Sequence, residues 1–401
     1  MLSHSINTTQ KIILLTATTH LDDESIESLK MLLKSKPDWQ FIKHFSEGQG
    51  TAPLLFKVIK KNNLSDFVPE HIYNHLQNIY FQTQTNNILA LEQLKRVLAV
   101  FNKESIRTVL LKGIASAEFI YKDLGLRPMG DIDIMVESNR LLDAEKILFD
   151  LGYYNTEPYK SYKLRTLDIH NHLNAFINKN IIIELHRDLN SIHHIYRIPN
   201  NQIWENINPV SIESEAAYII KTEKNLQYLS LHTIAHFLDK RIRLNNFTDI
   251  SELIKIEEKN INWIQFEKEC KANNISLPVY RALSLCKTYF NAPVPDDIIG
   301  KLQGKGESLE NQFTYLLNNQ VEKINLKTRT NYFKKIRKIE GVKNKFMYLW
   351  AEVFPSKEYI VFTYKLKNKN FYFFYYFVQF FRQVNKSLSN MFLLLKRFWK
   401  K

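Results

Sequence analysis

Two aspartates stand one residue apart in LRPMGDIDIMV, residues 126–136. The apolar residues around them predict a buried strand, where a carboxylate is costly unless a positive charge compensates it. Side chains two positions apart on a strand share a face, so Asp131 and Asp133 are expected to point together. Converging carboxylates repel each other unless a cation lies between them, and oxygen ligands favour Mg²⁺ or Mn²⁺. The pair predicts a metal site suited to phosphoryl transfer; the alternative is a turn aspartate followed by a strand-edge aspartate that faces water.

A third carboxylate occurs in IIIELHRDL, residues 181–189. In an extended strand Glu184 and His186 share one face with Ile182, while the other isoleucines and Leu185 occupy the opposite face. Glu184 is the one acid in the middle of this run. Taken alone, it is explained by a solvent-facing strand position without a functional role. Beside an Asp-x-Asp strand in the same small sheet, we expect it to complete the metal site.

A phosphate-binding turn is predicted at VLLKGIAS, residues 109–116. Lys112 and Gly113 fall where a strand gives way to a helix, and backbone N–H groups at such a junction attract anions. Arg127, four residues before Asp131, offers a second positive contact to a triphosphate. Three of the ten glycines in the chain also lie within residues 113–130, which marks this window as one where backbone freedom or close approach matters.

The elements that position these residues are predicted from the periodicity of apolar positions. We expect helices over 22–104, a strand–helix–loop–strand unit over 107–136, a helix from a Ser138 N-cap to Gly152, a hairpin over 172–189, and helices again from about 203, including 213–244. The predicted fold class is α+β, a small mixed sheet with packed helices, flanked by N- and C-terminal helical regions. The expected divisions are 1–105 N-terminal helical region, 106–202 catalytic core, 203–320 C-terminal helical region and 321–401 basic aromatic tail.

The segment LLKGIASAEFIYKDLGLRPMGDIDIMV, followed by IIIELHRDL, resembles the bacterial uncharacterised nucleotidyltransferase family of the DNA polymerase β-like superfamily. The shared pattern is a lysine-glycine turn, a helix, an arginine-proline loop, Asp-x-Asp and a Glu-x-His strand. The resemblance extends over about residues 1–365, with His232, His236, Arg243 and Asp249 at matching places in a helical region. As a pair four residues apart on a helix, the two histidines suggest either a zinc site or a polar helix surface facing a cleft.

The resemblance implies a transferase that uses Mg²⁺ or Mn²⁺ and a nucleoside triphosphate, with ATP as the expected donor. An acceptor hydroxyl would attack the α-phosphorus and pyrophosphate would leave. The implied roles are metal binding and catalysis for Asp131, Asp133 and Glu184, and nucleotide binding for Lys112, Gly113, Arg127 and His186. Two positions depart from the family pattern: Lys112-Gly113-Ile114 replaces the usual Gly-Ser pair, and Arg187 stands where an aromatic is expected. The acceptor would be a small molecule, a peptide or a protein, in a peptide or polysaccharide biosynthetic pathway.

Charge is concentrated at one end of the chain. Residues 321–401 hold 19 Lys and Arg against four Asp and Glu, whereas residues 1–320 hold 36 against 37. No run in the tail reaches the length of about 18–20 apolar residues that spans a bilayer. Residues 366–401 therefore suggest a helix packed on the body, a segment in the plane of an anionic membrane or, less favoured, a nucleic-acid contact.

The remaining composition favours a cytoplasmic protein, peripheral at the inner face of the membrane if the tail binds there. Cys270 and Cys286 form no disulfide framework, and the amino terminus lacks the pattern of a secretory signal. Two other functions stay open at this stage. One is a catalytically silent nucleotide-binding scaffold, and the other is an adaptor that acts through the basic aromatic tail.

Overall fold

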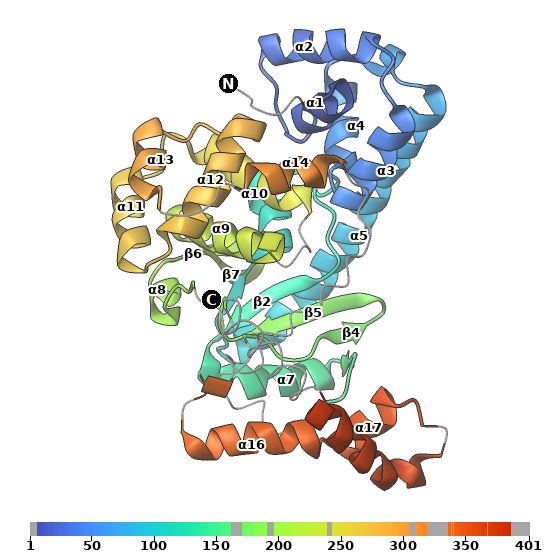
Figure 1. The fold of residues 1–401 in the computed structure, drawn as a ribbon, viewed down its shortest axis with the longest axis vertical. Coiled ribbons are helices and arrows are strands. Elements are labelled where there is room, and N and C mark those ends of the chain that lie inside the picture. Colours follow the sequence, from blue (N-terminus) through green and yellow to red (C-terminus); the bar gives the residue numbers. More distant parts are fainter. Residues whose placement is uncertain are drawn as a thin grey trace, which may run out of the picture. The chain divides into compact units, whose positions relative to one another are not determined.

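The computed structural model describes residues 6–161, 171–190, 196–238, 243–304, 309–318, 336–337, 339, 341–366 and 368–385. Within them the protein is mostly helical, and seven strands form one mixed sheet with helices before and after it in the chain (Figure 1). The predicted α+β class is confirmed. Among the described residues, no helix is both long enough and apolar enough to cross a bilayer.

The N-terminal part is helical as predicted, and one further helix, α1, precedes the predicted range of 22–104. Its elements are α1 (Thr8–Leu15), α2 (Asp23–Lys34), α3 (Trp39–Gln49), α4 (Ala52–Lys61), η1 (Ser65–Phe67) and α5 (Glu70–Lys103). Asp22 caps α2 by accepting a hydrogen bond from the Ser25 N–H, as an N-cap residue does. The 34-residue α5 buries a stripe with helical spacing: Ile72, Leu76, Tyr80, Thr83, Asn87, Ala90, Leu94, Val97, Leu98 and Phe101.

The sheet has the strand order β3-β4-β5-β2-β1-β7-β6. Its strands are β1 (Thr108–Leu110), β2 (Ile132–Val136), β3 (Tyr154–Asn155), β4 (Phe176–Asn178), β5 (Ile181–His186), β6 (Ile207–Ile212) and β7 (Glu215–Ile220). β1 and β7 are parallel, with Val109 opposite Tyr218, whereas the pairs β3–β4, β4–β5 and β6–β7 are antiparallel. This order makes β2 and β5, the strands of the predicted metal ligands, neighbours.

The predicted hairpin forms between β4 and β5. Its two connecting residues, Lys179 and Asn180, have φ of 46° and 67°. Positive φ at both central positions matches the right-handed twist of the flanking strands, and asparagine tolerates it well. The tight turn fixes the register of β5, with Ile183 opposite Phe176, and thereby determines which face carries Glu184.

Two local predictions are wrong. Residues 213–244 were expected to be one helix, but the first part forms β7 and the helix α9 (Thr222–Leu238) begins later. Pairing with β1 and β6 overrides the helical preference of Glu and Ala in that run. Ser138 begins the 3₁₀ turn η3 (Ser138–Arg140), and Arg140 rather than Ser138 precedes helix α7 (Leu141–Asp150). Gly152 does end this helix region, with φ of 84°.

The chain divides into two compact units, Met1–Ile134 with Tyr196–Leu326 and Met135–Ile195 with Lys327–Lys401. The first contains α6 (Lys112–Ala115), the π-helical turn η2 (Ser116–Tyr121), α8 (Asn200–Trp204), α9, α10 (Leu244–Glu257), α11 (Trp263–Ala272), α12 (Ser276–Phe290), α13 (Asp296–Leu302) and α14 (Glu310–Asn318). The second contains α7, the β3–β5 strands, α16 (Val342–Val353), α17 (Lys357–Thr363), η5 (Lys369–Phe373) and a helix over 374–385. The four-part division expected from the sequence stays a prediction, and residues 367 and 386–401 of the tail lie outside the described residues.

The loop between η2 and β2 is fastened to the N-terminal helices through Asp123. Its carboxylate accepts hydrogen bonds from Lys57 Nζ at 2.8 Å, from Tyr80 Oη at 2.8 and 3.1 Å, and from the Gly125 N–H at 3.0 Å. A Cβ atom on Gly125 would lie 2.4 Å from the Tyr80 ring, so the loop approaches α5 too closely for any side chain there. Gly125, one of the clustered glycines, is thus needed for packing.

We expect Asp123→Asn to reduce the free energy of unfolding by about 1–2 kcal/mol near neutral pH, because charge-assisted hydrogen bonds are lost. Partial burial by itself raises the pKa of Asp123, but the bonds from Lys57, Tyr80 and Gly125 outweigh it and hold the pKa below 3.8. A depressed folded-state pKa stabilises the fold above the unfolded pKa, and this stability is lost as the pH falls through the folded value. Urea unfolding should show the variant and the wild type converging below about pH 4. Asp66→Asn, at an exposed position, is the control and should leave stability unchanged.

Candidate functional site

Asp133 lies inside β2 and is buried, with 5% of its surface exposed. Lys112 Nζ lies 2.7 Å from Asp133 Oδ1 and forms an ion pair with it. The two backbones are also joined, since the Leu111 N–H donates to the Asp133 carbonyl at 3.0 Å. The positive charge that a buried carboxylate requires is therefore supplied by the lysine of the strand-to-helix turn.

Asp131 lies just before β2, which begins at Ile132, and it is half-buried. Its negative charge is among those that raise the pKa of Arg127. The assigned strand thus includes the second aspartate of the Asp-x-Asp pair but not the first.

Glu184 and His186 lie on β5 with the facing expected from strand alternation. Ile183 and Leu185 are buried on the opposite face, His186 is 1% exposed, and the Glu184 side chain keeps 25% of its surface exposed. His186 Nε2 lies 3.5 Å from Glu184 Oε2. The His172 ring packs against His186 with centroids 5.1 Å apart, and the two residues form an isolated antiparallel bridge.

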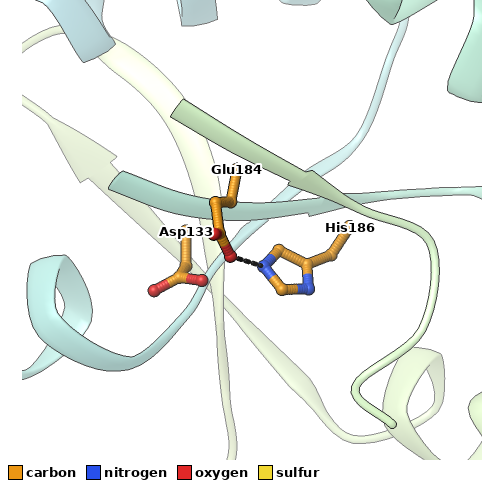
Figure 2. A group of neighbouring side chains, drawn as sticks. All are labelled: Asp133, Glu184 and His186. Carbon is orange, nitrogen blue, oxygen red and sulfur yellow. Dashed lines mark ion pairs between the residues drawn. The ribbon is translucent and has the colours of Figure 1, made fainter. Parts of the chain in front are cut away.

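Asp133, Glu184 and His186 come together as one group. One ligand atom from each lies within 4.8 Å of the others (Figure 2). Figure 2 shows the Glu184 carboxylate between the Asp133 carboxylate and the His186 ring. The sequence predicted the convergence of an aspartate of β2 with Glu184, but it did not place His186 among the metal ligands. Two carboxylates fit Mg²⁺ or Mn²⁺, and the imidazole nitrogen adds a ligand that transition ions accept more readily than Mg²⁺ does.

Lys112 and Gly113 open the short helix α6 as the sequence predicted. Lys112 adopts φ of 45°, a left-handed conformation that lysine rarely takes, so the turn is held in a strained form. A Cβ atom on Gly113 would lie 3.1 Å from Met129 Cγ and 3.3 Å from its Sδ. The Met129 side chain of the 126–130 loop therefore packs closely against this turn.

Arg127 is buried, and its guanidinium is engaged with Asp249 of α10. Arg127 Nε lies 2.9 Å from Asp249 Oδ1, Arg127 Nη2 lies 2.9 Å from Asp249 Oδ2, and Nη1 donates to the Pro128 carbonyl. Burial alone lowers the pKa of Arg127, but the Asp249 charge outweighs burial and raises it. Tyr121 Oη also donates to Asp249 Oδ1 at 3.0 Å, and burial raises the pKa of this tyrosine well above its ordinary value. The sequence predicted a triphosphate contact for Arg127, and that role stays a prediction.

Asn87 is a positioning residue that the sequence reasoning missed. From the buried stripe of α5, its side-chain amide donates to the Leu124 carbonyl at 2.7 Å and to the Arg127 carbonyl at 2.9 Å. A polar amide in the middle of an apolar helical stripe must find partners, because an unpaired one is costly. That anomaly was the available signal. Together with Asp123 and Asp249, it fixes the loop that leads into Asp131.

His232 and His236 lie next to each other on α9, with ring centroids 4.1 Å apart and the ring planes tilted by 40°. Across the described ranges, the grouping of possible metal ligands includes neither of them. Both interpretations of this pair, a zinc site and a polar helix surface, stay predictions. Cys270 and Cys286 are free and buried, and burial raises the pKa of each thiol to about 12, so neither is a reactive nucleophile at neutral pH.

The sequence comparison agrees with this geometry. No curated protein and no solved structure matches the chain significantly. The sequence model of a family described as "uncharacterised nucleotidyltransferase" matches residues 35–291, a range that contains every residue of the site. Since this match covers more than half of the chain, the protein belongs to the uncharacterised nucleotidyltransferase family.

Proposed function

We propose that the protein is a divalent-metal-dependent nucleotidyltransferase that moves a nucleoside monophosphate from a triphosphate, with ATP as the expected donor, to an acceptor hydroxyl. The observation that carries this proposal is the convergence of Asp133, Glu184 and His186 within 4.8 Å. Two carboxylates this close repel each other, and a cation between them relieves the repulsion. Family membership supports the same reaction class.

The residues that would hold Mg²⁺ or Mn²⁺ are Asp133, Glu184 and Asp131, which lies just before β2. When bound, the ion would supply Lewis-acid polarisation of the donor phosphates. His186 is positioned through its contact with Glu184, so it would orient that carboxylate or serve as a further ligand. The carboxylates would thereby be held rigidly before substrate arrives, which is the main contribution a protein makes to this chemistry.

Lys112 and Gly113 are the residues that we assign to the donor phosphates. The Lys112 ammonium lies beside Asp133, so it would also be close to a donor phosphate that binds a metal ion held by that carboxylate. In the reaction, the acceptor oxygen forms a bond to the α-phosphorus and the α–β bridging bond breaks. Pyrophosphate leaves and the acceptor hydroxyl releases its proton to solvent. We expect the acceptor to be a small molecule, a peptide or a protein.

The test is release of pyrophosphate from each of the four common triphosphates in the presence of panels of hydroxyl acceptors. We expect release with at least one combination, loss of the signal on removal of divalent metal with EDTA, and recovery with Mg²⁺ or Mn²⁺. Binding of a non-hydrolysable ATP analogue, measured by calorimetry, should show the same metal dependence and needs no acceptor. Equal analogue binding with and without EDTA would contradict the proposal.

A catalytically silent nucleotide-binding scaffold is the second candidate, and one observation favours it. Lys112 Nζ already compensates the buried Asp133 carboxylate, so a cation other than a metal serves that position. This candidate predicts analogue binding that EDTA leaves unchanged and that Lys112→Met abolishes. The enzyme proposal instead predicts that Lys112→Met keeps Mn²⁺ binding and weakens only the triphosphate.

A further inference from the structure

The helix over residues 374–385 places its apolar side chains outward. Phe374, Phe377, Val378 and Phe381 are each between 48% and 67% exposed, and their spacing forms a single helical stripe. Surface helices of globular proteins normally turn such a stripe toward the core and their polar residues toward water. Here the arrangement is reversed, which calls for an explanation other than packing within the chain.

The opposite face of this helix is polar and is fastened to neighbouring elements by hydrogen bonds. Gln379 is 2% exposed; its Nε2 donates to the Glu352 carbonyl at 2.8 Å, and its Oε1 accepts from Tyr364 Oη at 2.8 Å. Tyr376 Oη donates to the Pro355 carbonyl at 2.9 Å. These specific bonds hold the helix with its apolar stripe facing out, so the exposure of the stripe is a built feature of this unit.

Helix α16 repeats the pattern. Val342, Phe346, Leu349 and Trp350 are exposed at helical spacing, while Tyr348 and Ala351 are buried on its other side. Aromatic contacts extend from α16 toward the last helix, in the pairs Phe346–Trp350, Trp350–Phe354 and Phe354–Tyr376, whose ring centroids are 5.9, 4.5 and 6.0 Å apart. We call the two exposed stripes together the aromatic face.

Basic residues surround the aromatic face. Among the described residues 341–385, six are basic and two are acidic: Lys343, Lys345, Lys357, Lys365, Lys369 and Arg382, against Glu352 and Glu358. Glu352 is buried and paired with Lys160 Nζ at 2.8 Å, which leaves Glu358 as the one exposed acid in that described stretch. Helices that lie on anionic membranes have this composition, with phenylalanine and tryptophan on one side and lysine and arginine around them.

We propose that the aromatic face docks the protein on the surface of an anionic lipid bilayer, with the helices in the plane of the membrane. Charge complementarity distinguishes this partner from the alternatives. A second copy would bring one cationic face against another, and residues 386–401 of the chain carry five basic residues and no acid, so neither compensates the charge. A bilayer with acidic headgroups supplies both the apolar layer and the negative charge. This inference does not depend on the proposed transferase activity.

The first experiment is flotation of the full-length protein with vesicles of phosphatidylcholine, alone or mixed with phosphatidylglycerol. We expect flotation with the mixed vesicles at about 0.1 M salt, and clearly weaker flotation with phosphatidylcholine alone or at about 1 M salt, where charge attraction is screened. Equal flotation with both lipids, or flotation with neither, would overturn the proposal.

The second experiment tests the aromatic face directly with Phe374→Ser/Phe377→Ser/Phe381→Ser. We expect vesicle partitioning to fall about a hundredfold, since each half-exposed phenylalanine that enters the bilayer contributes several-fold or more. The matched control is Phe81→Ser/Ile88→Ser/Leu89→Ser, which removes three apolar side chains of similar exposure from α5 and should leave partitioning unchanged. Equal loss in both variants would overturn the assignment to this face. The wild-type lipid and salt comparison remains decisive if the first variant fails to fold.

Other partners predict different results. If the partner is a nucleic acid, a single-stranded oligonucleotide should bind the protein more tightly than the mixed vesicles do. If the partner is a second copy, light scattering should show a dimer that the Phe374→Ser/Phe377→Ser/Phe381→Ser substitutions dissociate. If residues 386–401 of the chain cover the aromatic face, vesicles should bind only after these residues are deleted. Any of these outcomes would replace the membrane proposal. In the Phe374→Ser/Phe377→Ser/Phe381→Ser variant, metal and triphosphate binding should be unchanged. This separates failure of the membrane inference from failure of the proposed function.

Discussion

Replacing Asp133 with asparagine is expected to weaken Mn²⁺ binding by about a hundredfold or more and to reduce any pyrophosphate release by about a thousandfold. Asparagine keeps the shape of the side chain but removes the charge that a metal ion requires. Asp133 is also the most buried carboxylate of the group. Calorimetric titration with Mn²⁺ measures the first effect without any knowledge of the acceptor.

The matched control is Asp143→Asn on α7, where the carboxylate is 60% exposed and pairs with Arg140. It should bind Mn²⁺ as the wild type does. Because Asp133 also pairs with Lys112, thermal unfolding must be followed alongside, so that loss of the fold is not mistaken for loss of the site. Glu184→Gln should weaken Mn²⁺ binding similarly. Unchanged Mn²⁺ affinity in folded Asp133→Asn would remove the basis of the proposed site.

Breaking the Arg127–Asp249 pair is expected to produce the largest loss of stability, about 3–5 kcal/mol for Arg127→Met or for Asp249→Leu. Each single replacement removes the opposite charge from a buried charged side chain. Asp249→Leu also removes the carboxylate that accepts a hydrogen bond from the Tyr121 hydroxyl. The double variant Arg127→Met/Asp249→Leu should lose clearly less than the sum of the two. Urea unfolding of the four proteins closes this double-mutant cycle.

A functional effect should accompany the loss of stability. Arg127 holds the loop that leads to Asp131, so the single variants should bind Mn²⁺ more weakly even under conditions in which they remain folded. Arg127→Lys keeps the charge but lacks the planar fork of donors, and it should restore stability only in part. Full Mn²⁺ affinity in folded Asp249→Leu would show that this pair stabilises the fold without positioning the site.

The local features of the site could be predicted from the sequence because they depend on short-range geometry. Alternation along β5 placed Glu184 and His186 on one face, and the turn between β4 and β5 was evident from its polar residues. The Lys112-Gly113 turn was likewise visible as the end of an apolar run. Each of these inferences needs only neighbouring residues and the repeat of a strand.

Long-range partners could not be predicted in the same way. Arg127 and Asp249 are 122 positions apart, and nothing in the local pattern indicates that the arginine turns toward α10. Lys112 and Asp133 are 21 positions apart, and a salt bridge between two predicted ligand-binding residues is a property of the folded sheet. The strand β7 was mistaken for helix for the same reason, since its pairing with β1 is not encoded in its own composition.

The parallel pairing of β1 with β7 has a consequence for how the protein is made. Val109 can meet Tyr218 only after about a hundred further residues have left the ribosome, so the central sheet stays incomplete during much of translation. Until then β1 presents an unpaired edge beside apolar neighbours, a state prone to intermolecular association. Expression of fragments that stop before residue 215 is therefore expected to yield aggregates, whereas chains that include β6 and β7 can close the sheet.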